Sequence, residues 1–363
     1  MSKRALIVCT IASFLQFELN DLKLLAEKGY EIHCATNFDG SEFMYEKLAT
    51  FHVINHQVDF ARSPFSRTNL KALGEVKRIM RDIHFDLVHC HTPVGGVVAR
   101  LAAKTHRKKG TKVIYTAHGF HFYTGAPKLY WLIFYPIEKW LSRYTDVLIT
   151  INTEDHARAE RFSMGRLEYV PGVGIDLTRF GAEHNTGIQG AENGIWLMSV
   201  GELNENKNHE TVIRAIADRE DIYYTIAGIG PLEQHLKELI AELHLEKRVF
   251  LLGYRRDVPA LFAAADIYIH PSYREGLSVS IMEAMASGLP VICSKIRGNK
   301  DLIDENGGFL FDPHSMEACR ESIAQMLEAD RDTMGQYNME KIKKFSIEVV
   351  QKKMAAIYES VER

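Results

Sequence analysis

The residues best suited to chemistry lie in the run YREGLSVSIMEAMASGLPV, residues 273–291. This run follows a predicted strand and starts a predicted helix near Ser278, and open parallel sheets bind ligands at the carboxyl ends of their strands. The unpaired N–H groups of a first helical turn, together with the helix dipole, favour an anion such as a diphosphate. Gly276 has no side chain and therefore leaves an anion room to approach.

Two carboxylates, eight residues apart, flank this helix start. Glu275 in the loop is placed to contact a sugar, and Glu283, about one turn inside the helix, is placed to accept hydrogen bonds from ribose hydroxyls. In the structural alternative, Glu283 is a solvated helix residue and Glu275 is a loop acid near a helix N-terminus, where acids are favoured in any case. Their combination with Gly276 and Ser278 favours a site for a nucleotide sugar.

The elements that must position these residues follow an α/β pattern. Short runs rich in Val, Ile and Leu alternate with amphipathic stretches, as in strands joined by crossover helices in buried parallel sheets. The predicted strands are 5–10, 31–36, 87–90, 112–116 and 147–150 in the first half and 195–200, 222–227, 249–252, 267–270 and 290–293 in the second. We therefore expect an α/β protein with two doubly wound parallel-sheet domains.

The length of 363 residues also favours two domains, because single hydrophobic cores stop growing at about 250 to 300 residues. The Pro- and Gly-rich segment 169–180 precedes a polar stretch, which places the expected boundary near residue 182. We expect an N-terminal domain over residues 1–182 and a C-terminal domain over residues 183–346. Residues 347–363 have apolar side chains at helical spacing, and we expect a closing helix that packs back on the N-terminal domain.

Composition excludes several classes of protein. The formal net charge of −3 gives no basic excess, so we expect no binding to nucleic acid. No window approaches the roughly 20 apolar residues needed to cross a bilayer, and the N-terminus has neither the long apolar segment nor the cleavage site of a signal peptide. The five cysteines are scattered and form no CxxC pair, which is typical of a reducing compartment. We expect a cytoplasmic protein whose contact with a membrane is peripheral.

The segment EGLSVSIME resembles the E-x7-E signature of the retaining glycosyltransferases of family 4, which have the two-domain GT-B fold. The resemblance extends over nearly the whole chain. The stretches DLVHCHTPVGG, YTAHGFHFYTGAP, YPIEKWLSRYTDVLITIN, YVPGVGID and SVGELNENKNHE are similar to bacterial capsular and exopolysaccharide glycosyltransferases. The resemblance implies two Rossmann-like domains facing across a cleft. It also implies that the C-terminal domain binds the donor through Glu275, Gly276, Leu277, Ser278 and Glu283.

A second donor-binding segment is implied at SVGELNENKNH. The family commonly has an arginine directly after the glycine of this segment and a lysine five positions later, both directed at the donor diphosphate. This sequence has Gly201 and Lys207 but carries Glu202 in place of the arginine. The resemblance therefore implies donor binding by Gly201 and Lys207, with Lys207 and the helix amides as the positive end of the site.

The segment TAHGFHFY follows a predicted strand of the N-terminal domain. By resemblance, His118 corresponds to a histidine near the reacting sugar and the acceptor, where an imidazole can donate or accept a hydrogen bond. The structural alternative is a satisfied histidine at a strand end. The trio His89, Cys90 and His91 does not indicate a metal site, because successive strand residues point to opposite faces. We expect no metal and no other cofactor.

Two basic segments bear on the acceptor. Segment 128–144 mixes Trp, Tyr and Phe with basic residues, a composition favoured at membrane interfaces, and the basic run 104–109 adds attraction for anionic lipids. In the alternative interpretation, the aromatic segment is a core helix broken at Pro136 and the basic run is a solvated loop. The resemblance favours a polyprenyl-diphosphate-linked saccharide as acceptor, at the inner face of the membrane.

The implied reaction is the transfer of a hexose or N-acetylhexosamine, with retention, from a nucleotide-diphosphate sugar to that acceptor. UDP is the expected nucleotide, and His118 and Glu275 are the expected catalytic residues. Two alternatives are a nucleotide-sugar epimerase of the same fold, which needs no acceptor, and a non-catalytic subunit that binds a sugar nucleotide. The first loop, TIASFLQF, lacks a GxGxxG fingerprint, which argues against a nicotinamide-binding domain.

Overall fold

The computed structural model describes residues 2–180 and 194–362, which fold as two units. Unit 1 comprises Met1–Gly174 and Ile347–Arg363, and unit 2 comprises Ile175–Ser346. The chain therefore passes from one unit to the other twice, after Gly174 and again after Ser346. The domain boundary expected near residue 182 lies outside the described residues.

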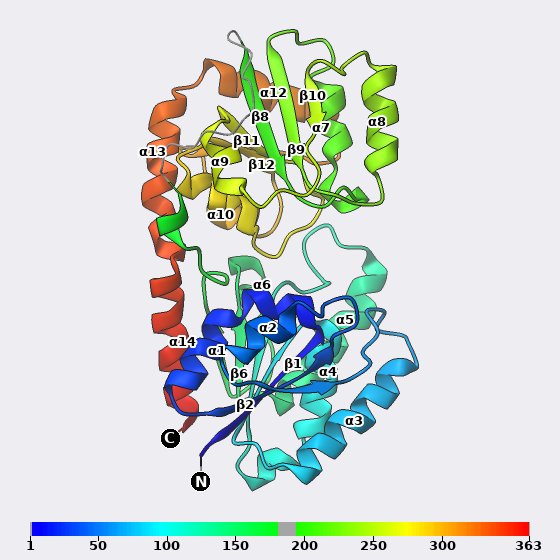
Figure 1. Cartoon of the computed structure of the whole chain (residues 1–363), viewed down its shortest axis with the longest axis vertical. Helices are drawn as coiled ribbons and strands as arrows, with labels where there is room; N and C mark the ends of the chain where they lie inside the picture. The colour runs from blue at the N-terminus through cyan, green and yellow to red at the C-terminus, as the bar shows by residue number, and fades with distance from the viewer. Residues whose placement is uncertain (1, 181–193, 363) are drawn as a thin grey trace. The chain divides into compact units, whose positions relative to one another are not determined.

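Unit 1 is built on a parallel sheet whose seven described strands lie in the order β3-β2-β1-β4-β5-β6-β7 (Figure 1). These strands are β1 (Arg4–Ile11), β2 (Glu31–Asn37), β3 (Ile54–Gln57), β4 (Leu87–His91), β5 (Lys112–Ala117), β6 (Val147–Thr150) and β7 (Arg166–Tyr169). All neighbours pair in parallel. Parallel neighbours need crossover connections, which explains the alternation of strands and helices along the chain.

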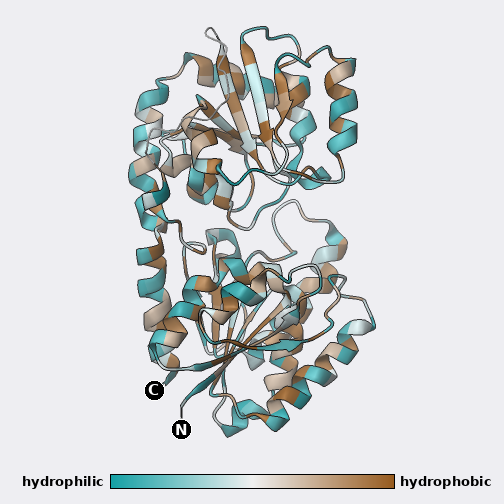
Figure 2. Cartoon of the chain, viewed as in Figure 1, coloured by the Kyte–Doolittle hydropathy of each residue, from teal (hydrophilic) through white to brown (hydrophobic). Residues whose placement is uncertain are grey.

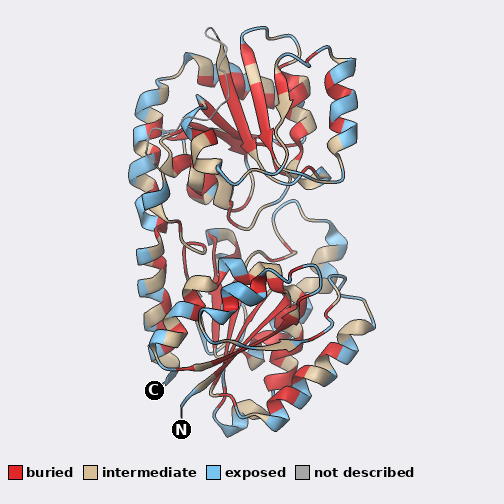
Figure 3. Cartoon of the chain, in the orientation of Figure 1, coloured by how far each residue is buried: buried red, intermediate tan, exposed pale blue. Residues whose placement is uncertain are grey.

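The crossovers of unit 1 contain helices on both sides of the sheet. They are α1 (Leu19–Glu27), α2 (Met44–Ala49), α3 (Thr68–Asp82), α4 (Pro93–Ala103), α5 (Lys128–Leu141) and α6 (Thr153–Ala159), with short 3-10 helices η1 (Ala12–Phe17), η2 (His106–Lys109) and η3 (Ser142–Tyr144). Consequently both faces of the sheet are buried: Leu6 and Val8 join the apolar cluster on one face, and Ala5, Ile7 and Cys9 join the cluster on the other. Figure 3 shows the central strands of this sheet as almost wholly buried.

The last helix, α14 (Ile347–Glu362), belongs to unit 1 and packs against α1. Its residues Val350, Met354, Ile357 and Tyr358 are buried at the spacing of one helical face. They join the apolar cluster that contains Ala5, Ile7 and Cys9 of β1. The C-terminal segment therefore covers part of a sheet whose first strand lies at the N-terminus.

Unit 2 repeats this architecture with a six-stranded parallel sheet, in the order β10-β9-β8-β11-β12-β13, within the described residues. The strands are β8 (Ile195–Val200), β9 (Ile222–Ala227), β10 (Val249–Leu251), β11 (Ile267–His270), β12 (Val291–Ser294) and β13 (Gly308–Phe311). The helices are α7 (His209–Ala215), α8 (Glu233–Glu242), α9 (Val258–Ala263), α10 (Val279–Ala286), α11 (Asn299–Leu302), α12 (Met316–Glu328) and α13 (Arg331–Ile342), with η4 (Leu177–Arg179), η5 (Glu205–Lys207) and η6 (Lys343–Phe345).

In both sheets the strand order reverses beside the first strand of the unit. β1 lies between β2 and β4, and β8 lies between β9 and β11, which is the order of Rossmann-like sheets. Because the connections from the two central strands leave toward opposite faces, a crevice opens at their carboxyl ends. This topology places the loops after β8 and β11, and those after β1 and β4, where ligands bind in such sheets.

The structure confirms the predicted α/β class with two doubly wound parallel sheets. All ten predicted strands are present, and their ends agree with the observed ends to within one residue. Strands β3, β7 and β13 were not predicted, and each lies at an edge of its sheet. An edge strand pairs on one side only and needs no continuous apolar run; β3, with the sequence INHQ, is partly exposed along its whole length.

The apolar residues of both units are concentrated in the sheets, which Figure 2 draws mainly in brown. The five cysteines are all buried and free. Within residues 2–180 and 194–362, no helix is both long enough and apolar enough to cross a bilayer.

Candidate active site

Lys207 and Glu275 meet at the carboxyl ends of two neighbouring strands of unit 2. Lys207 is the last residue of η5, which follows β8, and Glu275 lies in the loop after β11. The Nζ atom of Lys207 lies 2.6 Å from Oε1 of Glu275. The two side chains are 20% and 15% exposed, so this ion pair is partly shielded from water and is stronger than a pair on the open surface.

Gly201, directly after β8, leaves room for the Lys207 side chain. A Cβ atom at Gly201 would lie 3.2 Å from both Cδ and Cε of Lys207, so any side chain there would push the lysine stem aside. Glu202, in the place of the expected arginine, is exposed. Among the described residues Glu202 forms no ion pair, and it adds no cation to the site.

His270, the last residue of β11, also contacts Glu275. Its Nε2 atom lies 3.0 Å from Oε1 of Glu275, and its Nδ1 atom lies 3.1 Å from the hydroxyl of Tyr268. An ionised carboxylate only accepts hydrogen bonds, so the imidazole proton lies on Nε2 and Nδ1 accepts from Tyr268. Sequence reasoning missed His270; the available signal was its position at the end of a buried strand, five residues before Glu275.

The environment keeps Glu275 ionised. Burial would raise the pKa of Glu275, but the charge of Lys207 and hydrogen bonds from His270 and Lys207 outweigh burial and hold the pKa well below its usual range. Burial lowers the pKa of His270, although the neighbouring carboxylate opposes this, so the ring is neutral near pH 7. The group facing the lysine cation is therefore a carboxylate supported by a neutral imidazole.

A second turn, which the sequence did not single out, fixes the loop after β11. The Nε atom of Arg297 donates to the backbone carbonyl oxygen of Glu275 over 3.0 Å. A Cβ atom at Gly298, where φ is +78°, would lie 2.2 Å from the carbonyl oxygen of Gly276, so only glycine permits this contact between two backbones. Leu277 is 8% exposed, and its side chain anchors the loop in the unit.

Helix α10 starts directly after this loop. Ser278 is its N-cap, and the Oγ atom accepts a hydrogen bond from the backbone N–H of Ile281 at 3.4 Å. The same Oγ lies 3.4 Å from Nε2 of His270, which connects the helix start to the ion pair. In the described parts of the chain, the N–H groups of Val279 and Ser280 have no hydrogen-bond acceptor. They provide two donors for an anion at the positive end of the helix dipole.

Glu283 lies further along α10 and is not part of the cluster around Lys207. Burial raises the pKa of Glu283 from 4.5 to about 7, and the charge of Arg179 opposes this shift. Within the described residues its carboxylate forms no hydrogen bond or ion pair. The structure therefore brings together Lys207 and Glu275 directly, with Glu283 as a partly buried carboxylate available for a hydrogen-bond donor.

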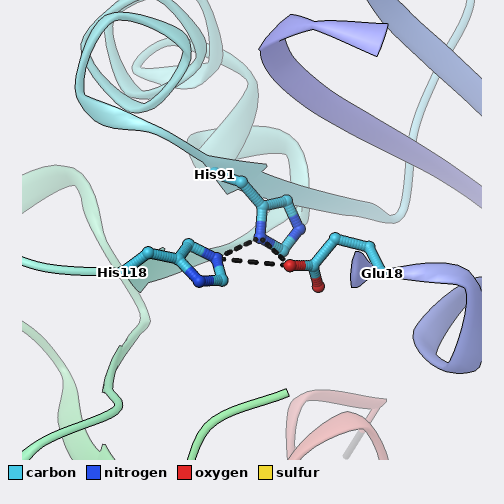
Figure 4. Close-up of side chains that lie close together, drawn as sticks. All are labelled: Glu18, His91 and His118. Atoms are coloured by element: carbon cyan, nitrogen blue, oxygen red, sulfur yellow. Dashed lines mark hydrogen bonds and ion pairs between the residues drawn. The ribbon is translucent and has the colours of Figure 1, made fainter. Parts of the chain in front are cut away.

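His118, directly after β5 in unit 1, lies in a cluster with two residues that the sequence analysis did not assign (Figure 4). Its Nε2 atom lies 3.2 Å from Nδ1 of His91, the last residue of β4. The Oε1 atom of Glu18, the residue before α1, lies 3.3 Å from Nε2 of His118 and 3.5 Å from Nδ1 of His91. The signal for Glu18 and His91 was positional, because both follow or end the strands at which the sheet order reverses.

Burial controls protonation in this cluster. Burial lowers the pKa of His118 to about 4 and, with the neighbouring histidines, lowers the pKa of His91 well below its usual value. Both rings are therefore neutral near pH 7. Burial, together with the charge of Asp21, raises the pKa of Glu18 well above its usual range.

A second buried hydrogen-bond network, centred on His89, packs against this cluster. The rings of His89 and His91 lie on the same face of β4, with centroids 4.2 Å apart. His89 contacts the hydroxyl of Tyr358 through Nδ1 at 2.9 Å and the hydroxyl of Thr116 through Nε2 at 2.8 Å. Tyr358 donates to Oδ2 of Asp21 at 3.0 Å, so Nδ1 of His89 must donate to Tyr358, and the ring position is fixed at both nitrogens.

An apolar cavity of about 270 Å³ lies elsewhere in unit 1. Residues of α3, α4, α5 and the loop after β5 line it, among them Leu70, Val97, Phe120 and Phe134. Segments 61–73 and 123–145, which contribute to this region, contain six basic residues and one acid, Glu138. The lining of the cavity is therefore mainly apolar, and the two segments that contribute to it are rich in basic residues.

The structure bears on one of the two interpretations of segment 128–144, that of a core helix broken at Pro136. Helix α5 is continuous through Pro136, so the helix is not broken as one alternative expected. Trp131, Phe134 and Tyr135 pack against the core of unit 1. Leu132, in contrast, is 74% exposed. The acid of this segment, Glu138, is buried in an ion pair with Arg100 at 2.8 Å, and the exposed charges are basic.

Comparisons with known proteins agree on one family. A family model described as Glycosyl transferases group 1 matches residues 185–341, and one described as Glycosyl transferase 4-like matches residues 6–152. The chain is 35% identical over 378 residues to EpsD of Bacillus subtilis, which is named as a glycosyltransferase, with 99% of this chain and 97% of EpsD covered. It is 26% identical over 330 residues to UDP-Gal:alpha-D-GlcNAc-diphosphoundecaprenol alpha-1,3-galactosyltransferase of Escherichia coli, with 85% and 83% covered.

A solved structure shows the same fold. The Anabaena protein Alr3699/HepE, crystallised in complex with UDP, matches with a TM-score of 0.79 at 20% sequence identity, covering 99% of this chain and 100% of that chain. EpsD and the Escherichia coli relative are named as transferases, and nothing in the comparisons favours the epimerase or the non-catalytic subunit. The near-complete match to EpsD, the two family models and the two doubly wound sheets together show that this chain is a glycosyltransferase, a member of the group 1, family 4-like glycosyltransferases of the GT-B fold.

Proposed function

We propose that this glycosyltransferase transfers a hexose or N-acetylhexosamine from a UDP-sugar to a polyprenyl-diphosphate-linked saccharide, with retention at the anomeric carbon, during capsular or exopolysaccharide synthesis. The observation that carries the proposal is the Lys207–Glu275 pair, 2.6 Å long, beside the start of α10. That arrangement has the charges and donors that a sugar diphosphate requires.

Lys207 and the start of α10 stabilise the leaving diphosphate. A lysine ammonium has three N–H donors, and the contact with Glu275 uses one of them. The remaining donors and the backbone N–H groups of Val279 and Ser280 are available to the diphosphate oxygens. Negative charge grows on these oxygens as the glycosidic bond breaks, so donors held in place in advance lower the barrier. Gly201 beside Lys207 and Gly276 beside the start of α10 have no side chain that could block the diphosphate at these two groups.

Glu275 and Glu283 recognise the sugar and the ribose, respectively. Glu275 is ionised and fixed by Lys207 and His270, so it presents a rigid acceptor to sugar hydroxyls. Glu283 has no partner among the described residues and can accept hydrogen bonds from ribose hydroxyls. Leu277 and Ser278 position the loop between these carboxylates. In this scheme the lysine and the helix amides provide the positive charge at the diphosphate, and donor binding needs no divalent metal.

Unit 1 binds the acceptor. His118 presents an imidazole that is neutral near pH 7 and can hydrogen-bond an acceptor hydroxyl. The apolar cavity and the basic residues of the two segments that contribute to it suit a molecule that combines a hydrocarbon chain with a diphosphate. Two relatives carry diphosphoundecaprenol or diphospho-undecaprenol in their names. The exposed apolar side chains of α5 and the surrounding lysines and arginines then hold the protein at the cytoplasmic face of the membrane, by peripheral contact.

Thermal unfolding with UDP, GDP, ADP and NAD tests the donor site. A ligand at 100 times its dissociation constant stabilises the folded protein by about 2.7 kcal/mol, which corresponds to several degrees of Tm for a domain of this size. We expect UDP to shift the parent protein and Lys207→Ala and Glu283→Ala to lose the shift.

Lys237→Ala is the matched control, because Lys237 also lies 2.6 Å from a glutamate, Glu233, but on the exposed surface of α8. This variant should respond to UDP as the parent does. If saturating UDP leaves the parent unchanged, or if NAD alone shifts it, the proposed donor site is wrong. Product analysis with a UDP-sugar panel and lipid-linked acceptors then tests transfer.

A further inference from the structure

Three atoms that can bind a metal converge at the carboxyl ends of the strands of unit 1. They are Oε1 of Glu18, Nδ1 of His91 and Nε2 of His118, and Figure 4 shows the three side chains pointing toward one another from three different elements. Their separations are 3.2 Å between the two nitrogens and 3.3 and 3.5 Å from the oxygen to Nε2 and Nδ1. These contacts lie within unit 1.

The separations fit one face of a metal-centred tetrahedron. Ligand atoms about 2.0 to 2.1 Å from a Zn²⁺ ion lie about 3.3 to 3.4 Å from one another in tetrahedral geometry. The observed values, between 3.2 and 3.5 Å, scatter closely around that length. Two imidazoles and one carboxylate also form a ligand set that selects transition metals over Mg²⁺ and Ca²⁺, which prefer oxygen ligands.

Hydrogen bonding within the described residues does not account for this convergence. One proton can be shared between Nδ1 of His91 and Nε2 of His118, but Oε1 of Glu18 is buried and has no hydrogen-bond partner. Glu18 as a residue is 5% exposed. Buried polar side-chain atoms usually have a hydrogen-bond partner, so an unpartnered Oε1 that faces two imidazole nitrogens requires an explanation. A cation between the three atoms would satisfy all of them.

We propose that Glu18, His91 and His118 bind one divalent transition-metal ion of the Zn²⁺ class, with an exchangeable fourth ligand. A small cavity of about 20 Å³ is lined by Glu18 and His118, among other residues of unit 1. This volume accommodates about one water molecule. Sites with three protein ligands keep the fourth position for water or a substrate hydroxyl, and we place that ligand in this cavity beside Glu18 and His118.

The rings are held in place before any ion arrives. The ring of Phe14 packs edge-on against His118 with centroids 4.8 Å apart. His91 packs against His89, whose own nitrogens are fixed by Tyr358 and Thr116. Packing of this kind limits the reorganisation that metal binding would need, and it maintains ligand direction.

This site goes beyond the proposed donor chemistry, which takes place in unit 2 without a metal. Ligation through Nε2 would fix the proton of His118 on Nδ1 and turn the ring into a dedicated hydrogen-bond donor. The site can therefore exist whether or not the donor assignment is correct. The two proposals have separate readouts, since UDP binding tests Lys207 and metal titration tests Glu18.

Calorimetric titration of the tag-free, chelator-treated full chain with ZnCl₂ provides the test, with Co²⁺ as a spectroscopic probe. We expect one Zn²⁺ per chain and a visible Co²⁺ absorption band of tetrahedral type. Glu18→Gln, which keeps the side-chain shape, and His118→Ala should each weaken Zn²⁺ binding by more than about tenfold. Far-UV circular dichroism and the UDP-induced shift in Tm establish that both variants are folded.

His56→Ala is the matched control. His56 forms another imidazole pair in unit 1, with Nε2 at 2.8 Å from Nδ1 of His33, so the variant removes a histidine from a pair without touching the three proposed ligands. It should bind Zn²⁺ as the parent does. The proposal is overturned if the parent binds no stoichiometric Zn²⁺, or if Glu18→Gln and His118→Ala bind it with parental affinity.

Discussion

Lys207 and Glu275 are 68 residues apart in the sequence, yet their side chains meet at 2.6 Å in unit 2. The contact exists because β8 and β11 are neighbours in the sheet although β9 and β10 separate them along the chain. His270 contributes a second contact to the same carboxylate oxygen at 3.0 Å. Each member of the pair therefore determines where the other points.

Replacing Glu275 by Gln should reduce turnover without unfolding the protein. The variant keeps the shape of the side chain but removes the charge that orients Lys207, and a misplaced catalytic group can reduce the rate by about 10²-fold. We expect kcat/KM with UDP-sugar and acceptor to fall to that extent, and Tm to fall because Lys207 loses its counter-charge, while circular dichroism shows that the variant is still folded. Glu233→Gln, in the exposed pair with Lys237 on α8, is the control and should keep parental rates. Parental activity of Glu275→Gln would exclude a role for its charge.

Binding of UDP should become tighter as the pH rises through about 7. Burial raises the pKa of Glu283 to about 7, and only the ionised carboxylate accepts hydrogen bonds through both oxygens. Below this pH, affinity that depends on the ionised form falls about tenfold per pH unit. Titrations between pH 5.5 and 8.5 (about three units around the pKa) should show this slope in the parent. In Glu283→Gln, any remaining change of UDP affinity with pH comes from UDP itself. If affinity depends on pH equally in the parent and in this variant, Glu283 does not bind UDP through its ionised carboxylate.

The same shift has a stability consequence of defined sign. Between the usual pKa of 4.5 and the raised value of about 7, the folded protein binds more protons at Glu283 than the unfolded chain does. The free energy of unfolding, relative to Glu283→Gln, should therefore decrease as pH rises through this window and level off above it. Urea unfolding of both proteins at a series of pH values measures this difference.

The buried pair of Arg100 and Glu138 should be sensitive to the loss of one partner. The two side chains are 1% and 10% exposed and lie 2.8 Å apart. Glu138→Leu leaves a guanidinium buried without its counter-charge, so we expect the free energy of unfolding of unit 1 to fall by about 3 to 5 kcal/mol. Arg100→Met combined with Glu138→Leu should recover much of this loss, which urea unfolding can measure. A double variant as unstable as the sum of the two singles would show that the charges do not interact.

Introducing a charge on the exposed side of α5 should weaken membrane contact. Leu132 is 74% exposed, and an aspartate there would both remove apolar area and repel anionic lipids. Co-sedimentation with vesicles that contain phosphatidylglycerol should fall several-fold for Leu132→Asp and should decrease for the parent at high salt. Met316→Asp, at the start of α12 in unit 2 and 40% exposed, is the control. If the parent and Leu132→Asp bind the vesicles equally, α5 does not contact the membrane.

The strands and the functional residues of single loops were both predictable because each leaves a local pattern in the sequence. A central strand of a parallel sheet is apolar on both faces, so β1, β8 and β11 are visible as continuous runs, whereas the edge strand β3 is not. Lys207 and Glu275 were recognised individually through their motifs. Their contact was not predicted, because it depends on which strands are neighbours, and that information is not local.

Residues that hold a functional side chain in place were harder to predict from the sequence. His270 ends a buried strand and Arg297 lies after another, so neither has a motif of its own, although each contacts Glu275. Glu18 lies in the connection after β1 and His91 ends β4, and they meet His118 only because β1, β4 and β5 are consecutive in the sheet. Such clusters follow from strand order and side-chain direction, which a single sequence does not specify.

The contribution of α14 to unit 1 imposes an order on biosynthesis. β1 is translated before unit 2 and Tyr358 after it, so the network of Asp21, Tyr358 and His89 closes only after the whole of unit 2 has been translated. Unit 2 is one continuous stretch, Ile175–Ser346, and its strands are all available before α14 is made. This protein therefore departs from the usual sequence in which N-terminal domains finish folding first. During that delay the face of the first sheet that carries Ala5, Ile7 and Cys9 lacks its final apolar cover.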